Sequence, residues 1–212
     1  MDIIAEDIQK YAEKYSSVES DVLAALNRET NTGFLFPRMI SGHLQGRFLS
    51  MISCLMQPRR ILEIGTFTGY SAICLAEGLC KGGMLHTIEL NDENETKIRE
   101  YFTKAGIEKK IQLHFGNAMD IIPSLDETFD LIFLDADKEN YINYYHLIMG
   151  KLRQGGLILA DNTLWSGKVL ETSQNDKETA GIREFNEIVT QDNRVENVLL
   201  TIRDGIMMIR KK

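Results

Sequence analysis

Short apolar runs alternate with amphipathic stretches from residue 58 to the end of the chain. Apolar runs rich in Ile, Leu, Val and Phe are typical of buried strands, and apolar positions three or four residues apart indicate helices. Strands that alternate with helices predict a mainly parallel α/β sheet covered on both faces. The predicted strands are 60–64, 84–90, 111–115, 131–135, 157–161, 198–202 and 206–209, and the predicted helices are 70–79, 93–105, 119–125, 141–152 and 177–190.

Only three residues, Arg203, Asp204 and Gly205, separate the last two predicted strands. A connection this short that contains glycine predicts an antiparallel hairpin at the end of the sheet. In open α/β sheets, ligands bind outside the carboxyl ends of the strands. We therefore expect the chemistry of the protein at the residues that directly follow the strands.

The first 57 residues have a different, helical pattern, with predicted helices at 3–15, 18–30 and 40–56 and a loop at 30–33. Ile3, Ile4, Ile8 and Tyr11 recur at helical spacing. The apolar segment 34–37 before the third helix is consistent with a lid, a dimer contact or local packing. We expect a single domain of 212 residues, in which 1–57 form a helical extension or lid and 58–212 form a Rossmann-like core.

Composition and charge narrow the class of protein. Hydrophobic residues make up 43% and charged residues 26% of the chain, as in ordinary globular proteins, and the net charge of −7 disfavours a general nucleic-acid binder. No apolar run approaches the length of a membrane span, and no secretion signal is recognisable. The three cysteines form no C-x-x-C pair, so we expect reduced, mostly buried thiols and a cytoplasmic location.

A glycine-containing loop follows the first predicted strand of the core, with Gly65 and Gly69 allowing a close approach of a ligand to the backbone. Its spacing is neither G-x-G-x-x-G nor that of a P-loop. Glu89 ends the second strand, where its carboxylate could accept both hydroxyls of a ribose. Glu63 would repel a phosphate but could receive a cationic or amine-bearing ligand, which favours S-adenosylmethionine over a dinucleotide. The alternative is the plain glycine turn of any Rossmann-like sheet.

Oxygen-bearing side chains follow two later strands: Asp135 after one, and Asp161 with Asn162 after the next. An all-oxygen set suits Mg²⁺, Ca²⁺ or Mn²⁺ and disfavours zinc, and two adjacent hydroxyls of an aromatic ring could complete it. Lys138 lies three residues after Asp135, where a nearby cation would disfavour its protonated form and make it a candidate general base. The alternatives are a helix N-cap for Asp135 and a solvated surface charge for Lys138.

At these positions the chain resembles the cation-dependent O-methyltransferases, which include catechol and caffeoyl-CoA O-methyltransferases, with a bacterial branch nearest. The resemblance implies a class I methyltransferase fold with a seven-stranded, mainly parallel sheet and an antiparallel last strand. It also implies a homodimer. Ala136 and Asp137 stand where the catechol enzymes have bulky residues, as in the caffeoyl-CoA type, whereas Ser166 departs from the asparagine usual there. The matching segments are 62–71, 88–89, 116–118, 135–141, 161–167 and 204–206.

The resemblance assigns roles to individual residues. It implies Asp135, Asp161 and Asn162 as metal ligands and Lys138 as the base, with Asp135 beside it in the catalytic site. The implied lining of the S-adenosylmethionine site is Met39, Ser41, Glu63, Gly65, Phe67, Ser71, Glu89, Ala118 and Asp135, with Met39 and Ser41 over the sulfonium end. The implied acceptor contacts are Met39, Lys138, Asn162 and Trp165.

The predicted function is transfer of a methyl group from S-adenosylmethionine to a vicinal-dihydroxy aromatic acceptor, with Mg²⁺ as the preferred cation. One alternative acceptor is hydroxyuridine in tRNA, for which Lys109-Lys110 and residues 210–212 could supply basic patches or be ordinary solvated charge. Another alternative is a catalytically silent module that only binds S-adenosylmethionine. A nicotinamide dehydrogenase is disfavoured by Glu63 and by the missing G-x-G-x-x-G.

Overall fold

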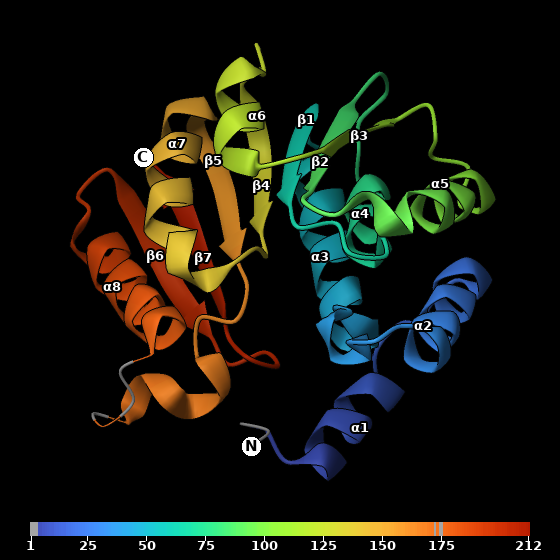
Figure 1. The fold of residues 1–212 in the computed structure, drawn as a ribbon, viewed down its shortest axis with the longest axis horizontal. Coiled ribbons are helices and arrows are strands. Elements are labelled where there is room, and N and C mark those ends of the chain that lie inside the picture. The colour runs from blue at the N-terminus through green and yellow to red at the C-terminus, as the bar shows by residue number, and fades with distance from the viewer. Residues whose placement is uncertain (1–3, 172, 174–175) are drawn as a thin grey trace. The chain divides into compact units, whose positions relative to one another are not determined.

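The computed structural model describes residues 4–171, 173 and 176–212, which divide into two compact units (Figure 1). One unit comprises residues 7–118, and the other comprises residues 119–212 together with residues 4–6. Among the described residues, every helix is too short or too polar to pass through a lipid bilayer. The division at residue 118 falls inside the region that the sequence assigns to the Rossmann-like core.

The 7–118 unit contains three parallel strands in the order β3-β2-β1. All three predicted strands of this region are present; the residues of β1 and β2 are mostly buried, whereas those of β3, at the edge of the three, are partly exposed. Glu63 lies opposite Thr87 in the register, and Glu89 lies opposite Phe115 at the carboxyl edge. The elements are α1 (Glu6–Lys14), α2 (Asp21–Gly33), η1 (Pro37–Met39), α3 (Gly42–Met56), β1 (Arg60–Ile64), α4 (Tyr70–Ala76), β2 (Met84–Glu89), η2 (Asp92–Asn94), α5 (Glu95–Lys104) and β3 (Ile111–Phe115).

The predicted loop at 30–33 is wrong, because α2 continues through these residues to Gly33. The Ser20 side chain caps the start of α2 by accepting a hydrogen bond from Leu23 N at 3.3 Å. Leu26 and Thr30, one turn apart, are both fully buried, so tertiary packing holds a segment that its polar composition makes a poor helix.

The apolar spacing in α1 does not produce a buried face in this chain. Ile8 is 60% exposed and Tyr11 is 65% exposed, and α1 has no buried residue. Ile3, also part of the predicted stripe, lies outside the described residues. The prediction of mostly buried cysteines is wrong for Cys54, which is exposed on α3; Cys74 is buried and Cys80 is partly exposed, and all three are free thiols.

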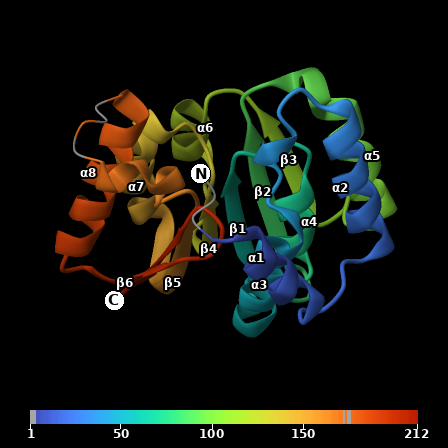
Figure 2. The same ribbon diagram turned by 90° about the horizontal axis from the view of Figure 1, so that it is seen from below.

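The 119–212 unit contains four strands in the order β4-β5-β7-β6. β4 and β5 are parallel, and β7 is antiparallel to both of its neighbours, as the predicted hairpin requires. The helices α7 and α8 lie on one face of these strands (Figures 1 and 2). The elements are α6 (Ala118–Ser124), β4 (Phe129–Leu134), η3 (Lys138–Asn140), α7 (Tyr141–Lys151), β5 (Leu152–Ala160), η4 (Trp165–Leu170), α8 (Lys177–Gln191), β6 (Val195–Leu200) and β7 (Ile206–Lys211).

Candidate functional site

Lys138 is the centre of the candidate site in the 119–212 unit. β4 ends at Leu134, and the chain then turns into the short helix η3, which begins at Lys138. The Lys138 side chain is almost completely buried, and its Nζ donates hydrogen bonds to Asp135 Oδ1 at 2.9 Å and to the Tyr141 hydroxyl at 2.7 Å. A solvated surface charge, the alternative for Lys138, is therefore wrong.

The charge state of Lys138 depends on the two carboxylates near it. Burial favours the neutral amine, but Asp135, the Tyr141 hydroxyl and Asp161 outweigh burial and raise the pKa of Lys138 above its usual value. The ammonium form is therefore stabilised where the carboxylates are not neutralised. Any cation bound to Asp135 and Asp161 would offset that attraction and lower the pKa of Lys138.

Tyr141 links the ends of β4 and β5 and was not singled out by the sequence patterns. Its hydroxyl accepts from Lys138 and donates to the backbone oxygen of Asp161 at 2.9 Å. The Tyr141 side chain is fully buried, and burial raises the pKa of its hydroxyl, which keeps the proton needed for that second bond. Its signal in the sequence is an aromatic residue three positions after Lys138.

The predicted metal ligands come from the ends of adjacent parallel strands. Asp135 follows β4 and keeps 23% of its side chain exposed, whereas Asp161, after β5, is buried and accepts a hydrogen bond from Asn162 N at 2.7 Å. Asp135 does not act as a helix N-cap, because Asp137 occupies that position of η3. The donor set of two carboxylates and one amide oxygen fits a hard cation. Within the described ranges, no group of three or more His, Cys, Asp or Glu is arranged to bind metal.

Trp165, the predicted acceptor contact, lies on a loop with unusual backbone angles. Asn162, Trp165 and Ser166 have φ values of +56°, +47° and +53°, in the left-handed region that non-glycine residues rarely adopt. The indole ring is partly exposed, and Lys168 Nζ lies 5.5 Å from its centroid. Strained residues of this kind cluster at ligand sites when surrounding contacts hold them in place.

In the 7–118 unit, Glu89 holds the predicted cofactor loop. Its Oε2 accepts hydrogen bonds from Thr66 N at 3.1 Å and from Phe67 N at 2.7 Å. Phe67 has φ of +50°, and Gly65, with φ of +99°, donates its N–H to Ile88 O at 2.9 Å. The loop after β1 is therefore tied to the end of β2, where the sequence predicts the ribose-binding carboxylate.

Glu63 lies below this loop, fully buried in β1. Its Oε2 accepts from Thr87 Oγ1 at 2.5 Å, and Thr87 Oγ1 is also 2.5 Å from Thr66 Oγ1. Glu63 thus supports the loop through a hydroxyl chain, and its predicted contact with the cofactor stays a prediction. Ser71, also buried, lies in the first turn of α4.

The remaining predicted cofactor residues differ in exposure. Ser41 at the start of α3 is buried, as is Ala118 at the start of α6, whereas Met39 is 57% exposed. The Phe34 ring meets the Phe67 ring edge to face, with centroids 5.8 Å apart. Phe34 was not predicted as a site residue, although the apolar segment 34–37 drew attention to this part of the chain.

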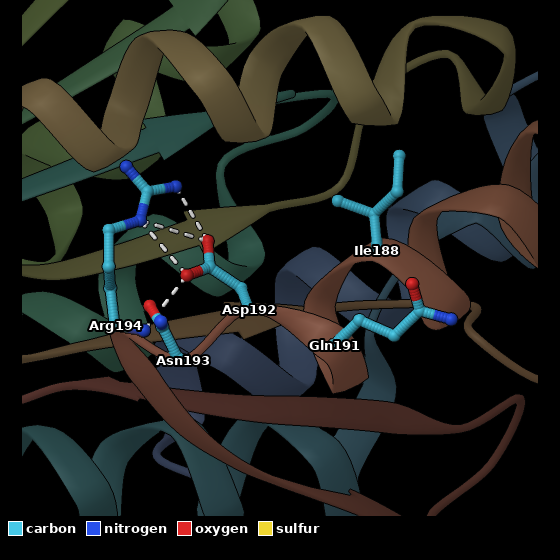
Figure 3. A pocket seen from close by; sticks show the side chains of 5 residues that line it. All are labelled: Ile188, Gln191, Asp192, Asn193 and Arg194. Atoms are coloured by element: carbon cyan, nitrogen blue, oxygen red, sulfur yellow. Dashed lines mark hydrogen bonds and ion pairs between the residues drawn. The ribbon is translucent and has the colours of Figure 1, made fainter.

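A shallow, open depression of about 380 Å³ lies at the end of α8 (Figure 3). It contains none of the predicted site residues, and Arg194 is paired there with Asp192, with Nη2 2.6 Å from Oδ2. This depression therefore does not change the assignment of the site. Its lining residues are Ile188, Gln191, Asp192, Asn193 and Arg194.

The basic residues 210–212 are used in contacts within the 119–212 unit. Arg210 pairs with Glu196 at 3.1 Å, and Lys211 Nζ donates to the backbone oxygens of Met149 on α7 and Leu152 at the start of β5, each at 2.7 Å. Lys212 Nζ donates to Asn193 O at 3.1 Å. These contacts favour ordinary structural charge over a nucleic-acid patch.

A protein-family model described as an O-methyltransferase family matches residues 13–212. A catechol O-methyltransferase from Niastella koreensis is 35% identical over 202 residues, covering 93% of this chain and 90% of the relative. A caffeoyl-CoA O-methyltransferase from Populus trichocarpa is 35% identical over 179 residues, covering 79% of this chain and 72% of the relative.

Solved structures of O-methyltransferases are also similar to this chain. An O-methyltransferase from Bacillus cereus, in complex with S-adenosylhomocysteine, has a TM-score of 0.89 and 30% identity, with 97% of each chain covered. One from Streptomyces achromogenes involved in tomaymycin synthesis, solved with S-adenosylmethionine, has a TM-score of 0.89 and 28% identity, covering 99% of this chain and 100% of that one. Together with the seven described strands, these similarities confirm the predicted fold class.

Proposed function

This chain belongs to the O-methyltransferase family, and we propose that it methylates a vicinal-dihydroxy aromatic acceptor with the help of a divalent cation. Family membership makes it an S-adenosylmethionine-dependent enzyme. The cation and the class of acceptor are the proposed parts. A catechol-like or caffeoyl-type compound is the acceptor that suits an all-oxygen metal set with open positions.

The observation behind this proposal is the group formed by Lys138, Asp135 and Asp161. A lysine is rarely buried unless it is paired, and here both carboxylates act on the same ammonium. Two carboxylates beside a single ammonium leave a net negative charge at the ends of the two strands, and this charge is suited to a bound cation. Asn162 adds a neutral oxygen next to Asp161 in the chain.

Each residue has a defined part in the proposed reaction. Asp135, Asp161 and Asn162 would hold the cation, with Mg²⁺ first and Ca²⁺ or Mn²⁺ as other choices. When bound, S-adenosylmethionine supplies the methyl group and the cation lowers the pKa of the acceptor hydroxyl. Lys138 Nζ would receive the hydroxyl proton or pass it to solvent, which requires the lowered lysine pKa described above.

Two residues near this group in the chain also have proposed roles toward the acceptor. Trp165 would pack against its aromatic ring, and the small Ala136 leaves more room than a bulky residue would. In the 7–118 unit, Met39 and Ser41 would close over the sulfonium end of the cofactor. Most of the rate enhancement should then come from alignment of the acceptor oxygen with the methyl carbon and from stabilisation of the developing oxyanion.

An acceptor screen with labelled S-adenosylmethionine tests the proposal. Catechol, caffeate, caffeoyl-CoA and bulk tRNA are each assayed with Mg²⁺ and with EDTA. We expect methyl transfer to at least one of the three phenolic acceptors, and we expect EDTA to abolish it. Undiminished transfer in EDTA would remove the metal from the proposal, and transfer to tRNA alone would replace the acceptor class.

A homodimer is the assembly that we propose for this enzyme. The N-terminal helices expose large apolar side chains, including Tyr11 on α1 and the pair Met51 and Leu55 one turn apart on α3. Exposed apolar side chains, when they gather into a patch, mark an interaction site. Light scattering should give a dimer mass, and Leu55→Glu should shift it toward the monomer; a monomeric wild-type protein contradicts the proposal.

A further inference from the structure

The turn between β6 and β7 holds the loop that carries Asn162. The backbone N–H groups of Thr163 and Leu164 donate to the carbonyl oxygens of Gly205, at 3.1 Å, and Asp204, at 2.9 Å. The Asp204 side chain adds two more bonds, accepting from Asn162 Nδ2 at 3.1 Å and from the backbone N–H of Ser166. Four hydrogen bonds therefore join two segments about 40 residues apart in the sequence.

The loop needs such contacts because its backbone is strained. Asn162, Trp165 and Ser166 all have positive φ. This conformation costs roughly 1–3 kcal/mol for most residues other than glycine, such as Trp165 and Ser166, whereas asparagine tolerates it better. Asp204 binds at both ends of this stretch, at the side chain of Asn162 and at the backbone of Ser166. Asp204 is thus placed to hold the Asn162 side chain and the loop around it in one conformation.

The chemistry of Asp204 also determines which way the Asn162 amide points. An ionised carboxylate only accepts hydrogen bonds, so it can bind Nδ2 of the amide but not Oδ1. Nδ2 faces Asp204, and Oδ1 is the amide atom that a hard cation binds. We propose that Asp204 is a positioning residue that presents Asn162 Oδ1 to the divalent cation. This inference rests on the proposed function, of which the cation is a part.

Binding of Mn²⁺ alone, measured by calorimetry and by the electron paramagnetic resonance signal of the free ion, tests this role without turnover. Loss of a residue that orients a metal ligand typically weakens metal binding by about 10–100-fold, and we expect that range for Asp204→Ala. Asp204→Asn keeps one oxygen that can accept only one of the two bonds, so its loss should be smaller. The affinity for S-adenosylhomocysteine should stay unchanged in both variants.

Asp176→Ala is the matched control. Asp176, in the same unit, also accepts a hydrogen bond from a backbone N–H, that of Thr179 at 3.0 Å. It caps the start of α8 and forms no hydrogen bond with the predicted metal ligands. This variant should lose stability, by about 1 kcal/mol, and keep its Mn²⁺ affinity. A general effect of loosening the unit would instead weaken Mn²⁺ binding in both variants and would overturn the inference.

A double-mutant cycle with Asn162→Ala shows whether Asp204 acts through Asn162. If it does, Asp204→Ala should weaken Mn²⁺ binding little further once Asn162 is gone. Equal losses in both backgrounds overturn the inference, as does wild-type affinity in a folded Asp204→Ala protein. If Asp204→Ala does not fold, Asp204→Asn replaces it in the same cycle. Failure of the wild-type protein to bind Mn²⁺ would instead refute the metal in the proposed function, and this inference with it.

Discussion

Gly181 on α8 allows that helix to lie directly against the backbone of Lys138. A Cβ atom at position 181 would be 2.6 Å from Lys138 O, whereas ordinary van der Waals contact begins at 3.4 Å. Gly181→Ala therefore requires a shift of about 0.8 Å between α8 and η3. Because a backbone carbonyl, not a flexible side chain, is the obstacle, the shift should displace the segment that positions Lys138.

The magnitude follows from two opposing effects. Alanine is favoured over glycine inside a helix by about 0.8–1 kcal/mol, whereas overpacking costs about 1–3 kcal/mol. The free energy of unfolding should therefore fall by about 0–2 kcal/mol. Turnover should suffer more, since misplacing a reacting group by about 1 Å can cost about 10²-fold.

Gly150→Ala is the control for this change, because a Cβ at Gly150 on α7 would have no neighbour within 4 Å. It should keep full turnover and gain up to about 1 kcal/mol of stability. Urea unfolding and kcat with the best acceptor from the screen measure both quantities. If Gly181→Ala gains as much stability as Gly150→Ala and keeps its kcat, the close approach of α8 to Lys138 has no functional consequence and the reasoning is wrong.

Three further changes test other parts of the molecule. Lys138→Ala should lower kcat by about 10²–10⁴-fold with unchanged affinity for S-adenosylhomocysteine, because it removes the proposed base; full activity would make Lys138 a bystander. Glu89→Gln should weaken S-adenosylhomocysteine binding by about tenfold or more in calorimetry, because its charge holds two loop amides and is the predicted ribose acceptor; unchanged binding would exclude that role. His114 lies against His86, and burial lowers the pKa of His114. The stability that its neutral ring contributes is therefore present above about pH 6.5, the pKa in the unfolded chain. It is lost as the pH falls through the lower pKa of the folded state. His114→Gln should flatten that dependence in urea unfolding between about pH 7.5 and about pH 5.5, and an identical slope in both proteins would assign the pH dependence to other groups.

The sequence predicted the strands best where apolar runs are short and have polar residues at both ends. The predicted bounds of β1 and β3 match the structure. The start of β5 was missed, because Arg153 and Gln154 interrupt the apolar pattern and are exposed although they lie in the strand. The end of α2 was missed for a related reason: the burial of Thr30 depends on tertiary contacts that no local pattern contains.

Candidate site residues could be selected from the sequence as residue types at strand ends, but the contacts that hold them could not. Asp135, Asp161 and Asn162 could be named as candidate ligands because the carboxyl ends of parallel strands meet at one edge. The burial of Lys138 could not, since it depends on Tyr141 and on α8, whose Gly181 lies about 40 positions further along the chain.

Asp204 is another residue whose proposed role depends on contacts that the sequence does not show. In the sequence it lies in one of the segments that resemble the family, but it is also a polar residue in a tight turn, where aspartate is common, and no role was assigned to it. Its importance appears only when the turn is seen to bind the loop after β5, at the amide of Asn162 and the backbone of Ser166. A ligand residue is recognised by its own chemistry, whereas the residue that orients it is recognised by what it touches. Substitutions at Asp204 and Gly181, chosen by contact, therefore test the structure more directly than substitutions at the predicted ligands, which test the proposed cation.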